Sequence, residues 1–263
     1  GSRRMASFNE KHFVCGYCLE DAGPLRETRR WVDGKAGAAP LPRVCFFLNK
    51  GSARYFPENV MPKLLLIDGS NYLFRAYHAL PPLTTSTGEP TGAIKGFLGM
   101  LSRVHTLAKP DMAAVIFDAP GKTFRHEMYP EYKANRPPMP DDLRVQIDPL
   151  EKVVAALGWK VLIVPGIEAD DVIGSLSAMA KREGVKSVVA TGDKDLSQLV
   201  DDDVVILNTM NTKFYDRAGV IEKYGVPPER IVDYLSLMGD KVDNVPGINK
   251  CGPKTAAKWI AEY

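Results

Sequence analysis

The sequence predicts an α/β fold: a mostly parallel, twisted β-sheet with helices on both faces, followed by a smaller helical subdomain. Five short apolar runs alternate with helical patterns between Met61 and Asn208, which is the order expected of parallel strands joined by crossover helices. After residue 216 only helical patterns follow, and they enclose a turn rich in glycine and lysine. These two observations give the fold class.

The expected strands are the apolar runs at residues 63–67, 112–117, 160–164, 187–190 and 204–207. Their nearly continuous Leu, Ile and Val content is typical of parallel strands that are buried on both faces. Between them, residues 72–79 and 93–108 are expected to be helical, separated by a Pro-, Gly- and Thr-rich loop. Residues 93–108 and 172–179 place apolar side chains at three- and four-residue spacing, which predicts amphipathic helices packed on the sheet.

Carboxylates follow four successive strand runs, namely Asp68, Asp118, then Glu168, Asp170 and Asp171, and then Asp193 and Asp195. In open α/β sheets the ligand site lies beyond the carboxyl ends of the strands, so these acids are expected to converge there. A helix N-terminus offsets only about 1 kcal/mol per negative charge, too little for the five acids in residues 168–195. Divalent cations are therefore expected; ordinary helix capping by Asp, the alternative, would account for one or two of them.

Oxygen-only ligand sets without His or Cys suit Mg²⁺, with Mn²⁺ as an alternative. With Asp240 and Asp243 the candidate ligands exceed what one magnesium ion needs, so two or more ions are predicted. Paired metals suit phosphodiester hydrolysis, because they activate water and stabilise the leaving oxygen. No Walker-type loop and no Ser or Cys nucleophile with a positioned base is evident in the sequence.

The arch segment, defined here as residues 121–144, has another character. It combines the bases Lys122, Arg125, Lys133 and Arg136 with the aromatic residues Phe124, Tyr129 and Tyr132. Bases that pair with phosphates beside aromatic rings that stack on nucleobases indicate single-strand recognition. The alternative is a solvated loop or helix face. Because the segment leaves directly from Asp118 at the acidic edge, the first interpretation is preferred.

A second nucleic-acid element is predicted near the C-terminal end. Gly247 and Gly252 bracket a tight turn, and Lys254 and Thr255 open the helix that follows. The pattern is similar to a helix-hairpin-helix, whose backbone N–H groups contact duplex phosphates without reading sequence. A simple packing corner between two helices is the alternative. Since Tyr263 lies early in the last helix, we expect the subdomain to be truncated.

The overall composition, 45% hydrophobic and 25% charged, is that of a globular protein. With no apolar run long enough to cross a membrane and no signal-peptide pattern, the expected location is cytoplasmic and nucleoid-associated, without a membrane partner. Residues 1–60 show no sustained period, so we expect an atypical extension outside the fold, with Met61 as the natural start. His12, Cys15 and Cys18 form half of a zinc-site pattern without a second half.

From Met61 onward the chain closely resembles the 5′-nuclease domain at the N-terminus of bacterial DNA polymerase I, of the flap endonuclease superfamily. The stretches that carry this resemblance are IDGSNYLFRAYHALPPL, FDAPGKTFRHEMYPEYKANRPPMPDDLR, GIEADDVIG, TGDKDLSQLV and YGVPPERIVDYLSLMGDKVDNVPGINKCGPKTA. It implies a PIN-like catalytic domain over residues 61–215 and a helical DNA-binding subdomain over residues 216–263. Residues 1–60 have no counterpart in the family.

The resemblance also implies roles for individual residues. A first metal group would be held by Asp68, Asp118, Glu168, Asp170 and Asp171, and a second by Asp193, Asp195, Asp240 and Asp243. The family's arch and scissile-phosphate contacts match Arg75, Tyr132, Lys133 and Arg136, with Tyr132 expected to stack on the terminal base. Further DNA contacts are expected at Lys122 and Arg125 and, in the hairpin that grips duplex DNA with a monovalent cation, at Gly247, Lys250, Gly252, Lys254 and Thr255.

The function implied is that of a 5′-3′ exonuclease and flap endonuclease acting on DNA with 5′ flaps or nicks and on RNA-primed DNA. A monomer is expected, fused in the full protein to proofreading-type and polymerase domains. Two alternatives stay open. One is a catalytically incomplete module that binds DNA structures. The other is a PIN-type ribonuclease, against which the Asp240/Asp243 pair and the hairpin argue, because a small ribonuclease needs no grip on a duplex.

Overall fold

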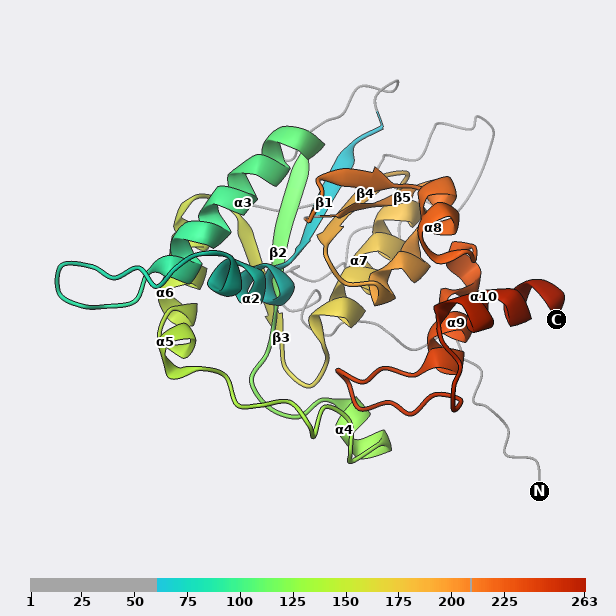
Figure 1. The fold of residues 1–263 in the computed structure, drawn as a ribbon. Coiled ribbons are helices and arrows are strands. Elements are labelled where there is room, and N and C mark those ends of the chain that lie inside the picture. The colour runs from blue at the N-terminus through green and yellow to red at the C-terminus, as the bar shows by residue number, and fades with distance from the viewer. Residues whose placement is uncertain (1–60, 209) are drawn as a thin grey trace, which may run out of the picture. The chain divides into compact units, whose positions relative to one another are not determined.

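The computed structural model describes residues 61–208 and 210–263, and the expectations for residues 1–60, including the half zinc site, lie outside them. The predicted fold class is confirmed: a six-stranded, mostly parallel sheet has helices on both faces and is followed by a helical region (Figure 1). No helix within the described residues is long and apolar enough to cross a membrane.

The strand order in the sheet is β3-β2-β1-β4-β5-β6. The bounds of the strands are β1 Lys63–Asp68, β2 Met112–Asp118, β3 Lys160–Val164, β4 Lys186–Thr191, β5 Val204–Asn208 and β6 Lys213–Tyr215. The first five are parallel, as expected, whereas β6 pairs antiparallel with β5. The sequence did not predict β6, because a three-residue run is too short to show the alternation of a strand.

The helices have the bounds α2 Gly69–Ala79, α3 Gly92–Ala108, α4 Phe124–Met128, α5 Asp141–Arg144, α6 Ile147–Ala156, α7 Ala169–Arg182, α8 Arg217–Tyr224, α9 Ile231–Met238 and α10 Pro253–Glu262. The described residues also form the 3₁₀ turns η1 Asp195–Leu199 and η2 Pro228–Arg230. The helices expected at 72–79, 93–108 and 172–179 lie within α2, α3 and α7.

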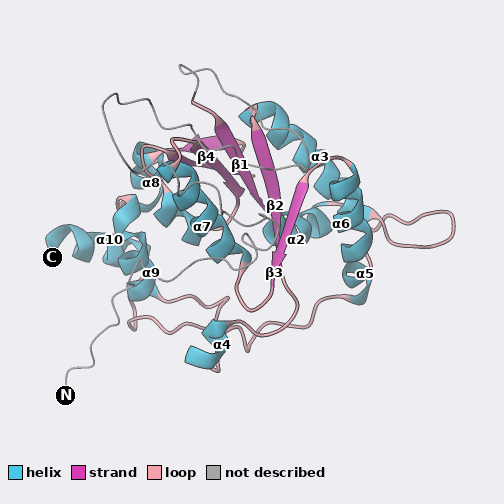
Figure 2. Ribbon diagram, turned by 180° about the vertical axis from the view of Figure 1, so that it is seen from behind, coloured by secondary structure: helices cyan, strands magenta, loops and turns pink. Residues whose placement is uncertain are grey.

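Alternation along β1 divides the core into two layers. Leu65 and Ile67 are fully buried against α2, α3 and α6, whereas Leu64 and Leu66 pack on the other face with residues of α7. Figures 1 and 2 show these helices on opposite sides of the sheet. Because successive strand residues point to opposite faces, one apolar run can fill both layers. The sheet is thereby held rigid where its carboxyl ends meet the site.

The start of α2 fixes the first site residue. Asp68 ends β1 and caps α2 by accepting a hydrogen bond from the backbone N–H of Asn71 at 3.0 Å. Gly69 follows at once, and a Cβ there would lie 2.8 Å from Ile116 O and from the Phe117 ring. Only glycine permits this close approach of α2 to β2. The Asp-Gly step therefore holds the Asp68 carboxyl at the strand end, almost fully buried.

The helical region is continuous with the α7 layer, because buried Val220, Ile231 and Ala256 belong to the same core cluster as Ile173. Helices α9 and α10 are joined by the hairpin loop, defined here as residues 239–252. Within this loop, Asp240 and Val245 exchange two backbone hydrogen bonds of 2.8 and 2.7 Å. Two helices joined by a loop, as expected of a helix-hairpin-helix-like region, are therefore present, with an additional tight turn at the start of the loop.

Candidate active site

Five of the predicted metal ligands gather at the carboxyl edge of the sheet, and we call them the inner acidic cluster: Asp68, Asp118, Asp170, Asp193 and Asp195. Burial raises the pKa of Asp68 from 3.8 to about 7, hydrogen bonds from Asn71 and Thr191 oppose the shift, and the charges of Asp118 and Asp193 add to it. Mutual repulsion of this kind requires the carboxyls to lie near one another. The predicted convergence of strand ends is therefore visible in the electrostatics.

Backbone and hydroxyl donors hold these carboxyls in place. Asp68 Oδ2 accepts from Thr191 Oγ1 at 2.8 Å, which joins the ends of β1 and β4. Asp118 Oδ1 accepts from the N–H of Ala169 at 2.8 Å, which ties the end of β2 to the start of α7. Asp193 Oδ1 accepts from the N–H of Asp195 at 2.9 Å. Each side chain is thus positioned by a neighbouring element of the sheet edge.

The inner acidic cluster has excess negative charge. Burial and then the charge of Asp193 raise the pKa of Asp195 to about 7, with Lys194 opposing. Burial, followed by the charges of Asp68 and Asp193, also raises the pKa of Asp170 well above its usual value. Asp195 Oδ1 is a buried acceptor with no hydrogen-bond partner among the described residues. A desolvated, repelling set of oxygens with an unsatisfied acceptor is the environment that a cation would relieve.

The other four predicted ligands, which we call the outer acids, each pair with a base: Arg125 with Asp171, Lys133 with Glu168, Arg136 with Asp243 and Lys194 with Asp240. The Arg125 guanidinium donates to both oxygens of Asp171, at 2.6 and 2.8 Å. Such a bidentate pair is among the strongest side-chain hydrogen-bond arrangements. The nine acids therefore differ in charge balance, because the outer acids have cationic partners and the acids of the inner acidic cluster form no ion pair with a described residue.

Tyr132 lies between two of the outer acids. Its hydroxyl is 2.9 Å from Glu168 Oε2 and 3.1 Å from Asp243 Oδ2, and its single proton can be donated to only one of them at a time. Burial, followed by the charges of Glu168 and Asp243, raises the pKa of Tyr132, so the hydroxyl stays a donor. Tyr132 as a whole is only 8% exposed. The surface expected to stack on a terminal base is therefore covered in this structure.

The arch segment is joined to the hairpin loop by hydrogen bonds between distant parts of the chain. The N–H of Lys133 donates to Asp243 O at 2.9 Å, and Asn135 Nδ2 donates to Lys241 O at 2.7 Å. In the opposite direction, Asn244 Nδ2 donates to Glu131 O at 2.8 Å. Figure 1 shows the two segments side by side near α4. The bases of the arch segment are thus fixed relative to the hairpin.

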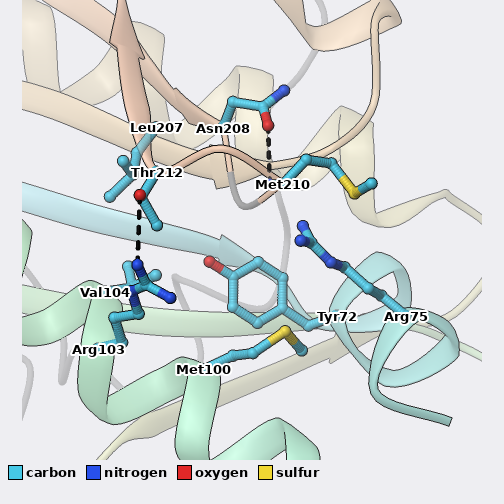
Figure 3. Close-up of a pocket in the computed structure, with 9 residues that line it drawn as sticks. All are labelled: Tyr72, Arg75, Met100, Arg103, Val104, Leu207, Asn208, Met210 and Thr212. Carbon is cyan, nitrogen blue, oxygen red and sulfur yellow. Dashed lines mark hydrogen bonds between the residues drawn. The ribbon is translucent and has the colours of Figure 1, made fainter. Parts of the chain in front are cut away.

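Other predicted residues lie apart from the acids. Lys122, Lys250 and Lys254 are exposed. Arg75 lines a pocket between α2, α3 and the end of β5 (Figure 3). The remaining predicted hairpin residues lie around the loop: Gly247 inside it, Gly252 at the N-cap of α10 and Thr255 in the first turn of α10.

Sequence reasoning missed three residues that shape the site. Thr191 Oγ1 donates a hydrogen bond of 2.8 Å to the Asp68 carboxylate. Ser70 Oγ accepts one of 2.9 Å from the backbone N–H of Asp118. Lys194 Nζ lies 2.8 Å from Asp240 Oδ2. The available signal for Lys194 was its position in the run Asp193-Lys194-Asp195, a base between two site acids. The hydroxyls gave no comparable signal, because Ser and Thr are common at turns and strand ends.

The contacts of the site residues bear on whether these residues suit a metal ion. Within residues 61–208 and 210–263, no three His, Cys, Asp or Glu side chains are arranged to hold a metal ion as the structure stands. The donor chemistry is nevertheless that of a hard cation, since the inner acidic cluster offers carboxylate oxygens alone. The unsatisfied Asp195 oxygen and the raised pKa values point in the same direction. By chemistry, the residues fit divalent cations.

Solved structures of low sequence identity share this fold. T5 5′-exonuclease with bound zinc ions superposes with a TM-score of 0.66 at 20% identity, covering 76% of this chain and 75% of that one. The catalytic core of Rad2 in complex with DNA gives a TM-score of 0.51 at 16% identity, covering 77% of this chain and 62% of that one. At such identities the likeness concerns the fold.

Closer relatives are found by sequence. DNA polymerase I of Pseudomonas aeruginosa is 57% identical over 193 residues, which cover 73% of this chain and 21% of that protein. The 5′-3′ exonuclease of Aquifex aeolicus is 46% identical over 203 residues, which cover 77% of this chain and 70% of that protein. The chain therefore spans about a fifth of the polymerase relative and most of the exonuclease relative.

Two family models match consecutive parts of the chain. Residues 63–225 match the 5′-3′ exonuclease N-terminal resolvase-like domain, and residues 226–263 match the 5′-3′ exonuclease C-terminal SAM fold. The first model alone covers more than half of the chain, and both follow the order of sheet and helical region described above. The chain belongs to the 5′-3′ exonuclease family.

Proposed function

We propose that this chain is a divalent-metal-dependent 5′-3′ exonuclease and flap endonuclease that cuts DNA at 5′ flaps or nicks and removes RNA from RNA-primed DNA. The observation that supports this most is the inner acidic cluster. Its five carboxylates come from three strand ends and the start of α7, and none of them forms an ion pair with a described residue. Buried negative charge without a side-chain counter-ion favours a metal-dependent hydrolase.

The inner acidic cluster would hold the divalent ions, Mg²⁺ or Mn²⁺, and two or more ions suit the number of carboxylates. When bound, such ions activate water and neutralise the phosphate that is cut. Asp68 and Asp118 orient their oxygens through the hydrogen bonds from Thr191 and Ala169. Because those donors belong to rigid strand and helix ends, the carboxyls need little reorganisation before the reaction.

The outer acids position the bases of the arch segment. Glu168 and Asp243 hold Lys133 and Arg136 next to the inner acidic cluster, where each base can exchange a carboxylate for a phosphate oxygen. Asp171 holds Arg125 in the same way. Once a bound phosphate has drawn the basic side chains away, the outer acids would be free to act as further metal ligands. The paired bases thus neutralise the outer acids when substrate is absent and contact the phosphate when it is bound.

The helical region supplies the duplex contact in this proposal. The hairpin loop and the first turn of α10 present Lys250, Lys254 and Thr255 beside backbone N–H groups, which bind phosphates of either strand without reading bases. A monovalent cation at the hairpin would assist this contact. The protein acts as a monomer, and the length of the polymerase relatives favours fusion to proofreading-type and polymerase domains.

The test uses a 5′-labelled flap duplex with Mg²⁺, with EDTA, and with Asp170→Asn. We expect cutting near the flap junction that requires metal and is lost in Asp170→Asn, while flap affinity in EDTA is retained. Asp202→Asn, an exposed acid outside both acidic groups, is the matched control and should cut normally. Binding without cutting by the unmodified chain would favour a non-catalytic DNA-binding module, and cutting of single-stranded RNA alone would favour a ribonuclease.

A further inference from the structure

A pocket of about 130 Å³ lies between α2, α3 and the turn that follows β5 (Figure 3). It is separate from both acidic groups, but it shares the carboxyl edge of the sheet with them, because Asn208 is the last residue of β5. Its volume is close to that of a cavity that holds one benzene ring, so a single phosphate group fits and a whole dinucleotide does not. Exposed Arg103 and Met210 place its rim at the surface.

The charge of the pocket is positive. Arg75 and Arg103 line it, and no Asp or Glu is among its described lining residues. Figure 3 shows the two arginines reaching along either side of Tyr72, from α2 and α3. Guanidinium groups that converge on one cavity favour a ligand with several acceptor oxygens.

The acceptors in the pocket wall are already engaged. Asn208 Oδ1 accepts from the backbone N–H groups of Met210 and Asn211, at 2.8 and 3.4 Å. Thr212 Oγ1 accepts from Arg103 Nη2 at 3.4 Å, a long contact that a better acceptor could replace. The wall therefore presents mainly donors to a ligand, and this favours an anion.

Tyr72 provides the second observation that indicates a ligand. Its side chain is 0% exposed and its ring packs edge-on against Phe97, yet its hydroxyl has no hydrogen-bond partner among the described residues. Burial raises the pKa of Tyr72, so the hydroxyl keeps its proton and can donate. In Figure 3 the hydroxyl points into the pocket between the two arginines. A buried donor without an acceptor is destabilising unless a ligand supplies one.

We propose that this pocket is an oxyanion subsite in which Tyr72, Arg75 and Arg103 bind one phosphate of the nucleic acid whose neighbouring phosphate is cut at the inner acidic cluster. The inference rests on the proposed function. Tyr72 and Arg75 lie on α2, the helix that Asp68 caps, so the subsite and the inner acidic cluster are joined by one element. The phosphate is either internal to a strand or terminal, and the experiment separates these sources.

The test measures binding of the full chain in EDTA, so it does not depend on cleavage. A series of flap duplexes each carries one neutral methylphosphonate, and affinities are compared for the unmodified chain, Tyr72→Phe, Arg103→Gln and Arg182→Gln. Arg182 is an exposed arginine at the end of α7 and serves as the control. We expect one methylphosphonate position to weaken binding by the unmodified chain and the control, but to have no effect in the two pocket variants.

Three further readouts make the outcome decisive. Arg103→Gln should lower the slope of log affinity against log salt by about 0.9, the value for one phosphate contact. Tyr72→Phe should bind more weakly without a lower melting temperature, whereas a purely structural tyrosine would lose stability. Duplexes with 5′-hydroxyl and 5′-phosphate ends distinguish an internal from a terminal phosphate. Identical methylphosphonate profiles in all four proteins, or no DNA binding at all, would overturn the subsite. If the methylphosphonate profile is as expected but the chain does not cleave the duplex, only the proposed function would be contradicted.

Discussion

Lys133 and Glu168 form an ion pair of 2.8 Å between Nζ and Oε1, although 35 residues separate them in the sequence. Lys133 adopts a left-handed backbone conformation, with φ of 57°, and its N–H is bonded to Asp243 O. The ammonium group also lies 4.0 Å from Asp243 Oδ2 and 4.8 Å from the centre of the Tyr132 ring, so three side chains hold it. A base held at this position can exchange its carboxylate partner for a phosphate oxygen, and this leads to the first prediction.

Lys133→Gln should slow flap cleavage by about 100-fold, the effect typical of removing one fixed donor to a developing charge. Duplex affinity in EDTA should change by less than about threefold, because the contact is made at the cutting site and not along the duplex. Lys152→Gln, at an exposed lysine of α6 outside the site, is the control and should leave the cleavage rate within about threefold of the unmodified rate. Parallel losses of affinity and rate in Lys133→Gln would contradict this assignment.

The metal-free protein should lose stability as pH rises. The folded-state pKa of Asp195 is raised to about 7 from 3.8, so the folded state binds more protons than the unfolded state between these values. In EDTA the free energy of unfolding should therefore fall from about pH 4 through about pH 7, by about 1.4 kcal/mol for each pKa unit of difference. Melting temperatures at pH 5 and pH 8 measure this fall, which Mg²⁺ should reduce. Asp195→Asn should flatten the profile, and a profile parallel to that of the unmodified chain would refute the prediction.

Two adjacent acids should respond oppositely to the same substitution. Asp170→Asn removes a buried charge that repels Asp68 and Asp193, so the metal-free protein should become more stable. Asp171→Asn breaks the bidentate contact with Arg125 and weakens the bond from the Glu168 N–H, so stability should fall by about 1–3 kcal/mol. Urea unfolding in EDTA measures both changes. Equal shifts would show that the division into inner cluster and outer acids is wrong.

Gly247→Ala should disrupt the hairpin loop. A Cβ at this position would lie 2.1 and 2.2 Å from the backbone C and O of Met238, and one at Gly239 would lie 2.3 Å from Gly247 N, so the two backbones are in direct contact. We expect loss of stability in unfolding experiments and loss of duplex affinity. Gly252→Ala is the matched control, because a Cβ there meets nothing within 4 Å and its φ is −99°. Gly252→Ala should keep stability, and destabilisation similar to that of Gly247→Ala would contradict this interpretation.

The strand ends were predictable from the sequence, because parallel buried strands give apolar runs and their polar ends are sharply marked. Asp68 and Asp118, at such ends, converge as expected. The short strand β6 gave no periodic signal. The pairing of Arg125 with Asp171 and of Lys133 with Glu168 was also invisible, since it depends on how the arch segment folds back across α7. The packing of the side chains determines which acids lack a basic partner. The sequence pattern alone therefore could not predict it.

Several hydrogen bonds join the arch segment to the hairpin loop, among them those made by Lys133, Asn135 and Asn244. A displacement of either segment is therefore transmitted mechanically to the other. Under the proposed function, the hairpin loop would contact the duplex and the arch segment would carry the bases to the phosphate, so a correctly seated duplex would set the position of Lys133 and Arg136. A misplaced duplex would leave the basic side chains of the arch segment misaligned. The protein would then distinguish DNA shapes through the coupling between the two segments and not through recognition of any nucleobase.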